Sequence, residues 1–239
     1  MRNLKYIFFL LPFLSYSQIT IDYTANKINN SRKIFLSIKI TNESGEKYAI
    51  PIDTTGFRVY YRDESYSNFF FGGADRGLGL TVLFSNKGEY QNGQSGGGYI
   101  NEENFDKQSI SNQSDSYHRQ LEKWKTKYNI KVDSIAEKNK YFFESIILLN
   151  PRQAIEFKTE LDPNLFNQDE NLILFNTYYL QPEKQYLFSL YHCIDAKSYQ
   201  VLTHRQKKEL YGYRLFSGNI KSQEIQYSFT EGKTNETIK

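Results

Sequence analysis

The sequence predicts a mainly β protein, built as an antiparallel β-sandwich with a helical insertion. Apolar and polar residues alternate over several short segments, most regularly at 33–41 and 185–191, and a period of two is that of a strand with one buried face. Residues that favour turns lie between these segments. A helical period of apolar residues spans 117–128 and interrupts the strands.

The N-terminal half is predicted to begin with strands joined by tight turns. Residues 18–25 and 33–41 each alternate, and the aliphatic residues of the second segment share one face. Gly45 can supply a positive φ in a turn, so residues 46–53 are expected to return and form a hairpin with 33–41. Pro51 has no N–H to donate, which predicts that the returning strand lies at a sheet edge or contains a bulge.

A long polar loop is predicted in the middle of the chain. Shorter strands at 57–61, 67–71 and 78–84 precede it, and the loop covers 86–110, which is longer than a compact domain usually holds without a role. Loops on rigid scaffolds often carry recognition, and exposed aromatic rings suit glycans and peptides. The candidate binding residues are Phe69, Phe70, Phe71, Tyr90 and Tyr99.

A helix with one apolar stripe follows the loop and is expected to pack on the sandwich. Ser114 or Ser116 can cap its start, and the helix either breaks near Asn129 or extends to about Lys140. Its basic opposite face is a solvated surface or a site for an acidic partner. Loop and helix together form an insertion at about 86–140. The stripe consists of Tyr117, Leu121, Trp124 and Tyr128.

Strands resume after the insertion. Thr203 with Gln206 has the pattern of a capping box, which predicts a short helix over 204–210. The sandwich domain is expected to cover 18–230, and the polar tail 231–239 is expected to be flexible. The predicted strands are 141–149, 154–161, 172–180 and 225–229.

The segment 180–191 organises the C-terminal half. Pro182 fixes its own φ and favours an extended Gln181, so the chain turns a corner before a strand begins. Alternate residues of that strand are predicted to be buried. They are Tyr186, Phe188 and Leu190.

The spacing of Leu180, Pro182 and Tyr186 resembles the tyrosine corner of fibronectin type III and immunoglobulin-like sandwiches. The resemblance covers about a dozen residues and implies an immunoglobulin-like β-sandwich. It also implies that the Tyr186 hydroxyl bonds a nearby backbone group.

The first 17 residues have the pattern of an export signal. Arg2 and Lys5 are followed by a short apolar stretch, and the small residues Ser15 and Ser17 favour cleavage before Gln18. The apolar stretch is shorter than the roughly 20 residues that span a bilayer. The mature chain is therefore expected to be periplasmic or secreted, without a membrane span.

Composition argues against nucleic acid as a partner and excludes stabilisation of the fold by an internal disulfide. Removal of Arg2 and Lys5 lowers the formal net charge from +3 to +1, which gives no electrostatic attraction to nucleic acid. Cys193 is the single cysteine, so no internal disulfide can form and packing must stabilise the fold. Cys193 itself is expected to be a small buried apolar residue.

The motifs of common enzymes are missing from the sequence, so no catalytic residue, metal ligand or cofactor is predicted. His118, His192 and His204 lack the spacing of a zinc site. Gly93-Gln94-Ser95-Gly96 only approaches the nucleophile motif of serine hydrolases, and the expected setting there is a loop. Paired carboxylates meet only in space, so carboxylate chemistry stays open.

The function expected from these observations is that of an exported, non-enzymatic binding or protein-interaction module of the cell envelope. Its partner would be a protein or a glycan, and the loop 86–110 would present the binding residues. Two alternatives stay open. One is an exported carboxylate-dependent hydrolase that acts on glycans, and the other is a structural subunit of the envelope.

Overall fold

The computed structural model describes residues 18–27, 33–62, 77–97, 107–165, 174–182 and 184–228, and it confirms that the protein is mainly β. The largest sheet has the order β13 (Gly218–Lys221), β11 (Gln185–Ile194), β5 (Gly79–Asn86) and β4 (Asp53–Arg58), with β14 (Ile225–Ser228) beside β11 and β6 (Glu89–Tyr90) beside β5. A second sheet contains β1 (Ile19–Lys27), β2 (Ile34–Asn42) and β9 (Ala154–Leu161). Two smaller sheets contain β12 (Arg214–Leu215), β3 (Tyr48–Pro51) and β8 (Ile146–Leu149), and β10 (Leu174–Thr177) with β7 (Gln94–Gly97).

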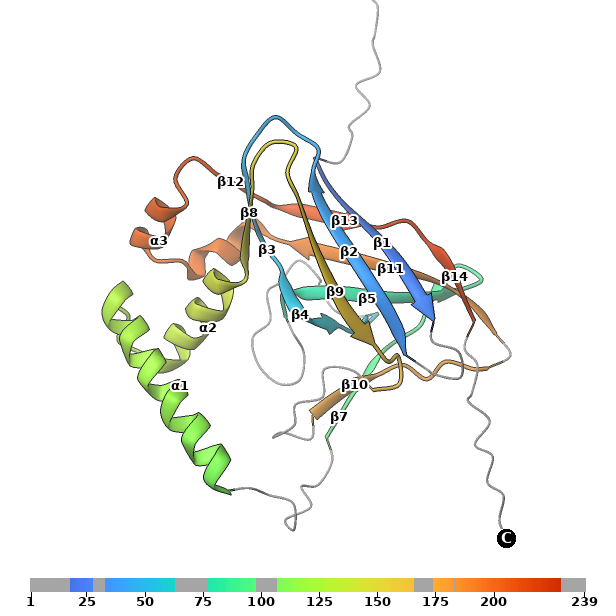
Figure 1. Ribbon diagram of the computed structural model, residues 1–239, viewed down its shortest axis with the longest axis horizontal. Coiled ribbons are helices and arrows are strands. Elements are labelled where there is room, and N and C mark those ends of the chain that lie inside the picture. Colours follow the sequence, from blue (N-terminus) through green and yellow to red (C-terminus); the bar gives the residue numbers. More distant parts are fainter. Residues whose placement is uncertain are drawn as a thin grey trace, which may run out of the picture.

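The two larger sheets enclose the core. Figure 1 shows the β1-β2-β9 sheet lying across the six-stranded sheet, with the helices gathered at one side. Tyr23 joins the two sheets, because its ring meets Phe188 edge-on at 5.3 Å between centroids and its hydroxyl donates to the Phe188 carbonyl at 2.8 Å. The aliphatic face of β2 is buried, as its alternation predicts.

Strand β11 is central, and its predicted face is confirmed. Tyr186, Phe188 and Leu190 are buried, and the strand pairs with β5 on one side and with β13 and β14 on the other. The Gln181 N–H donates to the Tyr186 hydroxyl oxygen at 2.9 Å, so the expected bond between this hydroxyl and nearby backbone is present.

The predicted hairpin between 33–41 and 46–53 is wrong. Strand β2 pairs with β1 and β9, whereas β3 pairs with β8 and β12. The turn after β2 is built by the Asn42 side chain, whose oxygen accepts from the Ser44 N–H at 3.0 Å and whose amide donates to the Glu46 carbonyl at 2.7 Å. Gly45 does not use a positive φ. The side-chain bonds of Asn42 redirect the chain into another sheet.

Pro51 does not place β3 at an edge, since β3 lies between β12 and β8. Pro51 is the last residue of β3 and lies beyond the pairing with β12, so its missing N–H costs no ladder bond there. The chain then passes through Ile52 into β4, which is parallel to β5 and has a register shift between Asp53 and Phe57. The β4–β5 and β12–β3 pairs are parallel, so the sheets are mixed rather than purely antiparallel.

The segment expected to be a long loop contains a tight hairpin and a strand. Lys87 and Gly88 both have positive φ, at 53° and 83°, and join β5 to β6 in the manner of a two-residue type I′ turn. Further on, β7 pairs with β10. A Cβ at Gly93 would lie 2.5 Å from the Cβ of Val59, so this close approach admits glycine alone.

The helical insertion is longer than predicted and consists of two helices. Helix α1 (Lys107–Tyr128) begins before Ser114 and Ser116, so neither serine caps it. It ends at Tyr128, and the next residue, Asn129, has a positive φ of 54°, so the predicted alternative of a break near Asn129 is confirmed. Helix α2 (Asp133–Glu144) follows. Residues 141–144 belong to α2 and not to the predicted strand, because Phe142 continues the buried helical face begun by Ala136.

Helix α1 packs on the other helices rather than on a sheet, which corrects the expectation. Leu121 and Tyr128 are buried, but Trp124 is only half-buried and Tyr117 is exposed. Trp124 packs on Tyr128 at 4.6 Å and on Phe143 of α2 at 5.9 Å between ring centroids. The predicted capping box at the start of α3 (His204–Glu209) is confirmed.

A buried polar network ties the helices together. Asn139 of α2 accepts from the Trp124 Nε1–H at 2.8 Å and exchanges two hydrogen bonds with the Gln206 amide. A 3₁₀ helix, η2 (Ala196–Val201), links β11 to this region, and its Tyr199 hydroxyl donates to the Phe216 carbonyl at 2.7 Å. The helices are therefore attached to the small β12-β3-β8 sheet.

Candidate functional site

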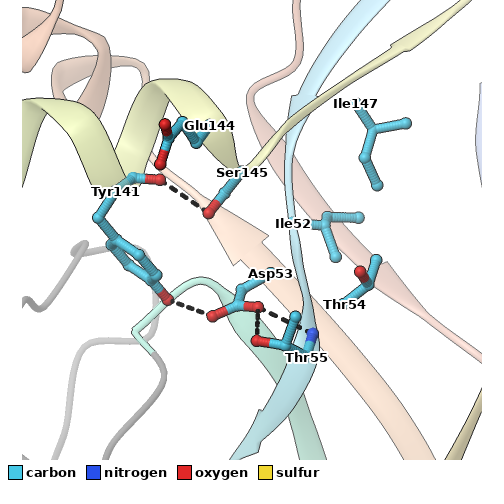
Figure 2. A pocket seen from close by; sticks show the side chains of 8 residues that line it. All are labelled: Ile52, Asp53, Thr54, Thr55, Tyr141, Glu144, Ser145 and Ile147. Carbon is cyan, nitrogen blue, oxygen red and sulfur yellow. Dashed lines mark hydrogen bonds between the residues drawn. The ribbon is translucent and has the colours of Figure 1, made fainter. Parts of the chain in front are cut away.

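A pocket of about 300 Å³ opens where α2 ends and β8 begins, beside the start of β4. Figure 2 shows the end of α2 on one side and the strand residues Ile52, Thr54 and Ile147 on the other. This volume lies at the lower end of the range for small-ligand sites. The lining residues are Ile52, Asp53, Thr54, Thr55, Tyr141, Glu144, Ser145 and Ile147.

Asp53 is the buried polar group of this pocket, with only 6% of its surface exposed. One carboxylate oxygen accepts from the Thr55 N–H at 2.8 Å and from the Thr55 hydroxyl at 2.6 Å. The other oxygen accepts from the Tyr141 hydroxyl at 3.0 Å (Figure 2). Three donors therefore offset the cost of burying the carboxylate and fix its orientation.

Backbone hydrogen bonds connect Ile52 and Asp53 to two neighbouring segments of the chain. The Ile52 N–H donates to the Ser145 carbonyl at 2.8 Å, and the Asp53 N–H donates to the Leu78 carbonyl at 3.0 Å. The Tyr141 hydroxyl also accepts from the Leu78 N–H at 3.2 Å. Strand β4, helix α2 and strand β5 thus meet at the pocket.

The electrostatic environment of the pocket is negative. Glu144 lies at the C-terminal end of α2, where the helix dipole is itself negative and where the last turn contains no basic residue. Lys140 forms an ion pair with Glu144 at 2.5 Å and offsets one of the two carboxylates. Partial burial raises the pKa of Tyr117 on α1, and the nearby charges of Glu137 and Glu144 raise it further.

Four of the five aromatic residues predicted as a binding site lie outside the described residues. They are Phe69, Phe70, Phe71 and Tyr99. Tyr90 lies on β6, is not part of the pocket lining, and packs on Tyr60 at 5.2 Å between ring centroids. The Lys221 ammonium group donates to the Tyr90 hydroxyl at 2.9 Å. The described part of the chain thus places Tyr90 in a small surface cluster of its own.

Two other sequence expectations change in the structure. Ser95 lies on strand β7 and not in a loop, and its hydroxyl donates to the Asn176 side-chain oxygen at 2.7 Å. Cys193 is half-buried rather than buried. Burial raises the pKa of Tyr191, and a hydrogen bond with the Cys193 thiol raises it further.

The pocket residues could not be found from local patterns. Asp53 and Thr55 have the spacing of an Asx turn, which is a local signal. Tyr141 and Glu144 lie about 90 positions further along, in a segment whose apolar residues predict a strand, and only the fold brings them to Asp53.

The chemistry of the pocket is that of oxygen acceptors. Its lining contains carboxylates and hydroxyls but no histidine, cysteine or lysine. Within the described residues no three side chains of His, Cys, Asp or Glu gather as metal ligands. Among the helices of the described ranges, none is long and apolar enough to cross a membrane.

Comparison with protein-family models, with curated proteins and with solved structures gives no match for this chain.

Proposed function

We propose that the protein is an exported, non-enzymatic binding module of the cell envelope, which engages its partner through the pocket at the end of α2. One observation carries this proposal. The pocket combines a buried, fully oriented carboxylate with an aliphatic wall from Ile52 and Ile147, which is the composition of a small recognition site.

Export is the second part of the proposal and rests on residues 1–17. We expect the mature protein from the envelope fraction to begin at Gln18. Intact-mass analysis tests this, and a mature protein that retains Met1 would contradict it.

The likeness to immunoglobulin-like sandwiches belongs to the same proposal. It is supported by the Gln181–Tyr186 hydrogen bond and by the two large sheets that enclose the core. Domains of this kind serve widely as binding scaffolds, which agrees with a non-enzymatic role.

The binding role can be tested by filling the pocket. The Thr54 side chain lies on the pocket wall (Figure 2), and Thr54→Trp would occupy the space without removing a bond of Asp53. Thr24→Trp, on the exposed face of β1, adds the same bulk elsewhere. We expect the mature protein and Thr24→Trp to capture the same envelope partner, and Thr54→Trp to lose it. Equal capture by all three would refute the role of the pocket, and loss on Tyr90→Ala alone would favour the cluster around Tyr90.

A carboxylate-dependent glycan hydrolase is the second candidate, since Asp53 and Glu144 line one pocket. A general acid or base must exchange a proton with substrate, whereas Asp53 is held by three internal donors. Glycan turnover that disappears on Asp53→Asn would establish this candidate in place of the binding role.

A further inference from the structure

We infer that the pocket binds the ammonium side chain of a lysine presented by a protein partner. This inference rests on the proposed binding function and names the chemistry that the pocket recognises. It follows from the inventory of donors and acceptors, from the charge and from the shape of the lining.

The hydroxyl protons of the lining are largely committed within the protein. Thr55 donates its proton to Asp53, Tyr141 donates to Asp53, and Ser145 donates to the Tyr141 carbonyl at 2.8 Å. The hydroxyl oxygens of Thr55 and Ser145 keep acceptor lone pairs, whereas the Tyr141 oxygen already accepts from the Leu78 N–H. The pocket therefore presents mainly acceptors, and a ligand that brings donors and no acceptors fits it best. A lysine ammonium group has three donors and no acceptor.

The charge of the lining points to the same ligand. Glu144 lies at the negative end of α2, and Asp53 lines the same pocket from β4. Within the described ranges, Lys140 is the ion-pair partner of Glu144. Carboxylates at a helix C-terminus are unfavourable for the helix itself. A bound cation would relieve this unfavourable arrangement, whereas an anion would increase it.

The shape separates a lysine from a compact inorganic cation. Figure 2 shows Ile52 and Ile147 on one side of the pocket and Tyr141, Glu144 and Asp53 across from them. Lysine has the matching construction, because its aliphatic stem packs on apolar surface while its head stays among polar groups. A volume of about 300 Å³ is large enough for the whole side chain.

Binding can be observed directly at the pocket wall by NMR of the δ1-methyl groups of Ile52 and Ile147 in the mature protein. The probes are the N-acetyl methylamides of lysine, Nε-acetyl-lysine, norleucine and arginine. We expect the lysine probe to shift both methyl resonances and to bind at least about fivefold more tightly than norleucine, which lacks the charge. Equal binding of lysine and norleucine, tighter binding of arginine, or no shift with any probe would overturn the inference.

Matched variants locate the charge that is responsible. Glu144→Gln removes an ion-paired glutamate of the pocket, and Glu160→Gln removes an ion-paired glutamate of β9, whose partner is Lys33. We expect Glu144→Gln to weaken the lysine probe roughly two- to fivefold and Glu160→Gln to leave it unchanged. Equal effects of both would overturn the inference by showing that the binding is non-specific.

These outcomes are separate from those of the proposed function. If Thr54→Trp abolishes partner capture while the lysine probe does not bind, the binding role stands and the assignment to lysine falls. If the lysine probe binds but Thr54→Trp captures the partner normally, the lysine site stands and the proposed role of the pocket falls.

Discussion

At the scale of single residues, His192 shows how burial sets a charge state. It lies on the core-facing side of β11, and its Nε2 atom has no hydrogen-bond partner among the described residues. Burial and, to a smaller extent, the positive charge of Arg58 lower the pKa of His192, a hydrogen bond with the Pro51 backbone opposes both, and the net result is a pKa of about 4. The imidazole is therefore neutral in the fold at pH 7, although an exposed histidine titrates near 6.5.

This shift predicts a loss of stability in acid. Between about pH 6.5 and pH 4 the unfolded chain binds a proton that the folded chain does not, so the free energy of unfolding falls by up to about 1.4 kcal/mol per pH unit. Denaturant titrations at pH 7, 6 and 5 measure the slope. We expect a shallower slope for His192→Gln and an unchanged slope for His204→Gln, whose side chain is exposed. Identical slopes for all three proteins would contradict the assignment.

Phe188 is the residue on which the assignment of the core can be tested. Its side chain is fully buried and packs on Tyr23 and Phe84, each at 5.3 Å between ring centroids. We expect Phe188→Ala to lower the free energy of unfolding by about 3 to 5 kcal/mol. Leu187→Ala, on the other face of β11 where 39% of the side chain is exposed, should cost less than about 1 kcal/mol. Similar losses for both would show that the two faces are wrongly assigned.

At the scale of elements, the capping box of α3 is a local device with a measurable effect. The Gln206 N–H donates to the Thr203 hydroxyl oxygen, and the Thr203 N–H donates to the Gln206 side chain at 2.8 Å. Thr203→Ala should lower the free energy of unfolding by about 1 kcal/mol. Thr126→Ala, inside α1 where the hydroxyl bonds only the preceding turn, is the control and should change it by less than about 0.5 kcal/mol.

The elements that sequence predicts well are those with local signals. Alternation predicts β2, β9 and β11, and the capping box predicts α3, because each depends on neighbours within a few positions. Strand pairing depends on distant partners, so the Asn42 turn sends β3 to β8 and β12 instead of to β2. The pocket could not be predicted for the same reason, since Asp53 meets Tyr141 across 88 positions.

At the scale of the whole molecule, the helices and the sheets share one core. Phe142 of α2 and Tyr199 of η2 belong to the same buried cluster as the inner faces of the two large sheets. The fold is therefore expected to unfold in a single transition. Trp124, the single tryptophan, reports on the helices by its fluorescence, and far-UV circular dichroism reports on the whole fold. We expect a blue-shifted native spectrum and coincident transitions, whereas two midpoints would show that the helical insertion unfolds separately.

The junction at Ile52 and Asp53 determines how the pocket can respond to a ligand. The N–H groups of these two successive residues point in different directions. The Ile52 N–H donates to the Ser145 carbonyl at the end of α2, and the Asp53 N–H donates to the Leu78 carbonyl just before β5. Moving β4 away from the end of α2 would break the Ile52–Ser145 bond together with the Tyr141–Asp53 contact. The pocket is therefore preformed and does not close around its ligand. Binding of a side chain then costs little free energy for rearrangement of the protein. Its selectivity must then come from the fit to fixed atoms, and its association rate from diffusion and charge.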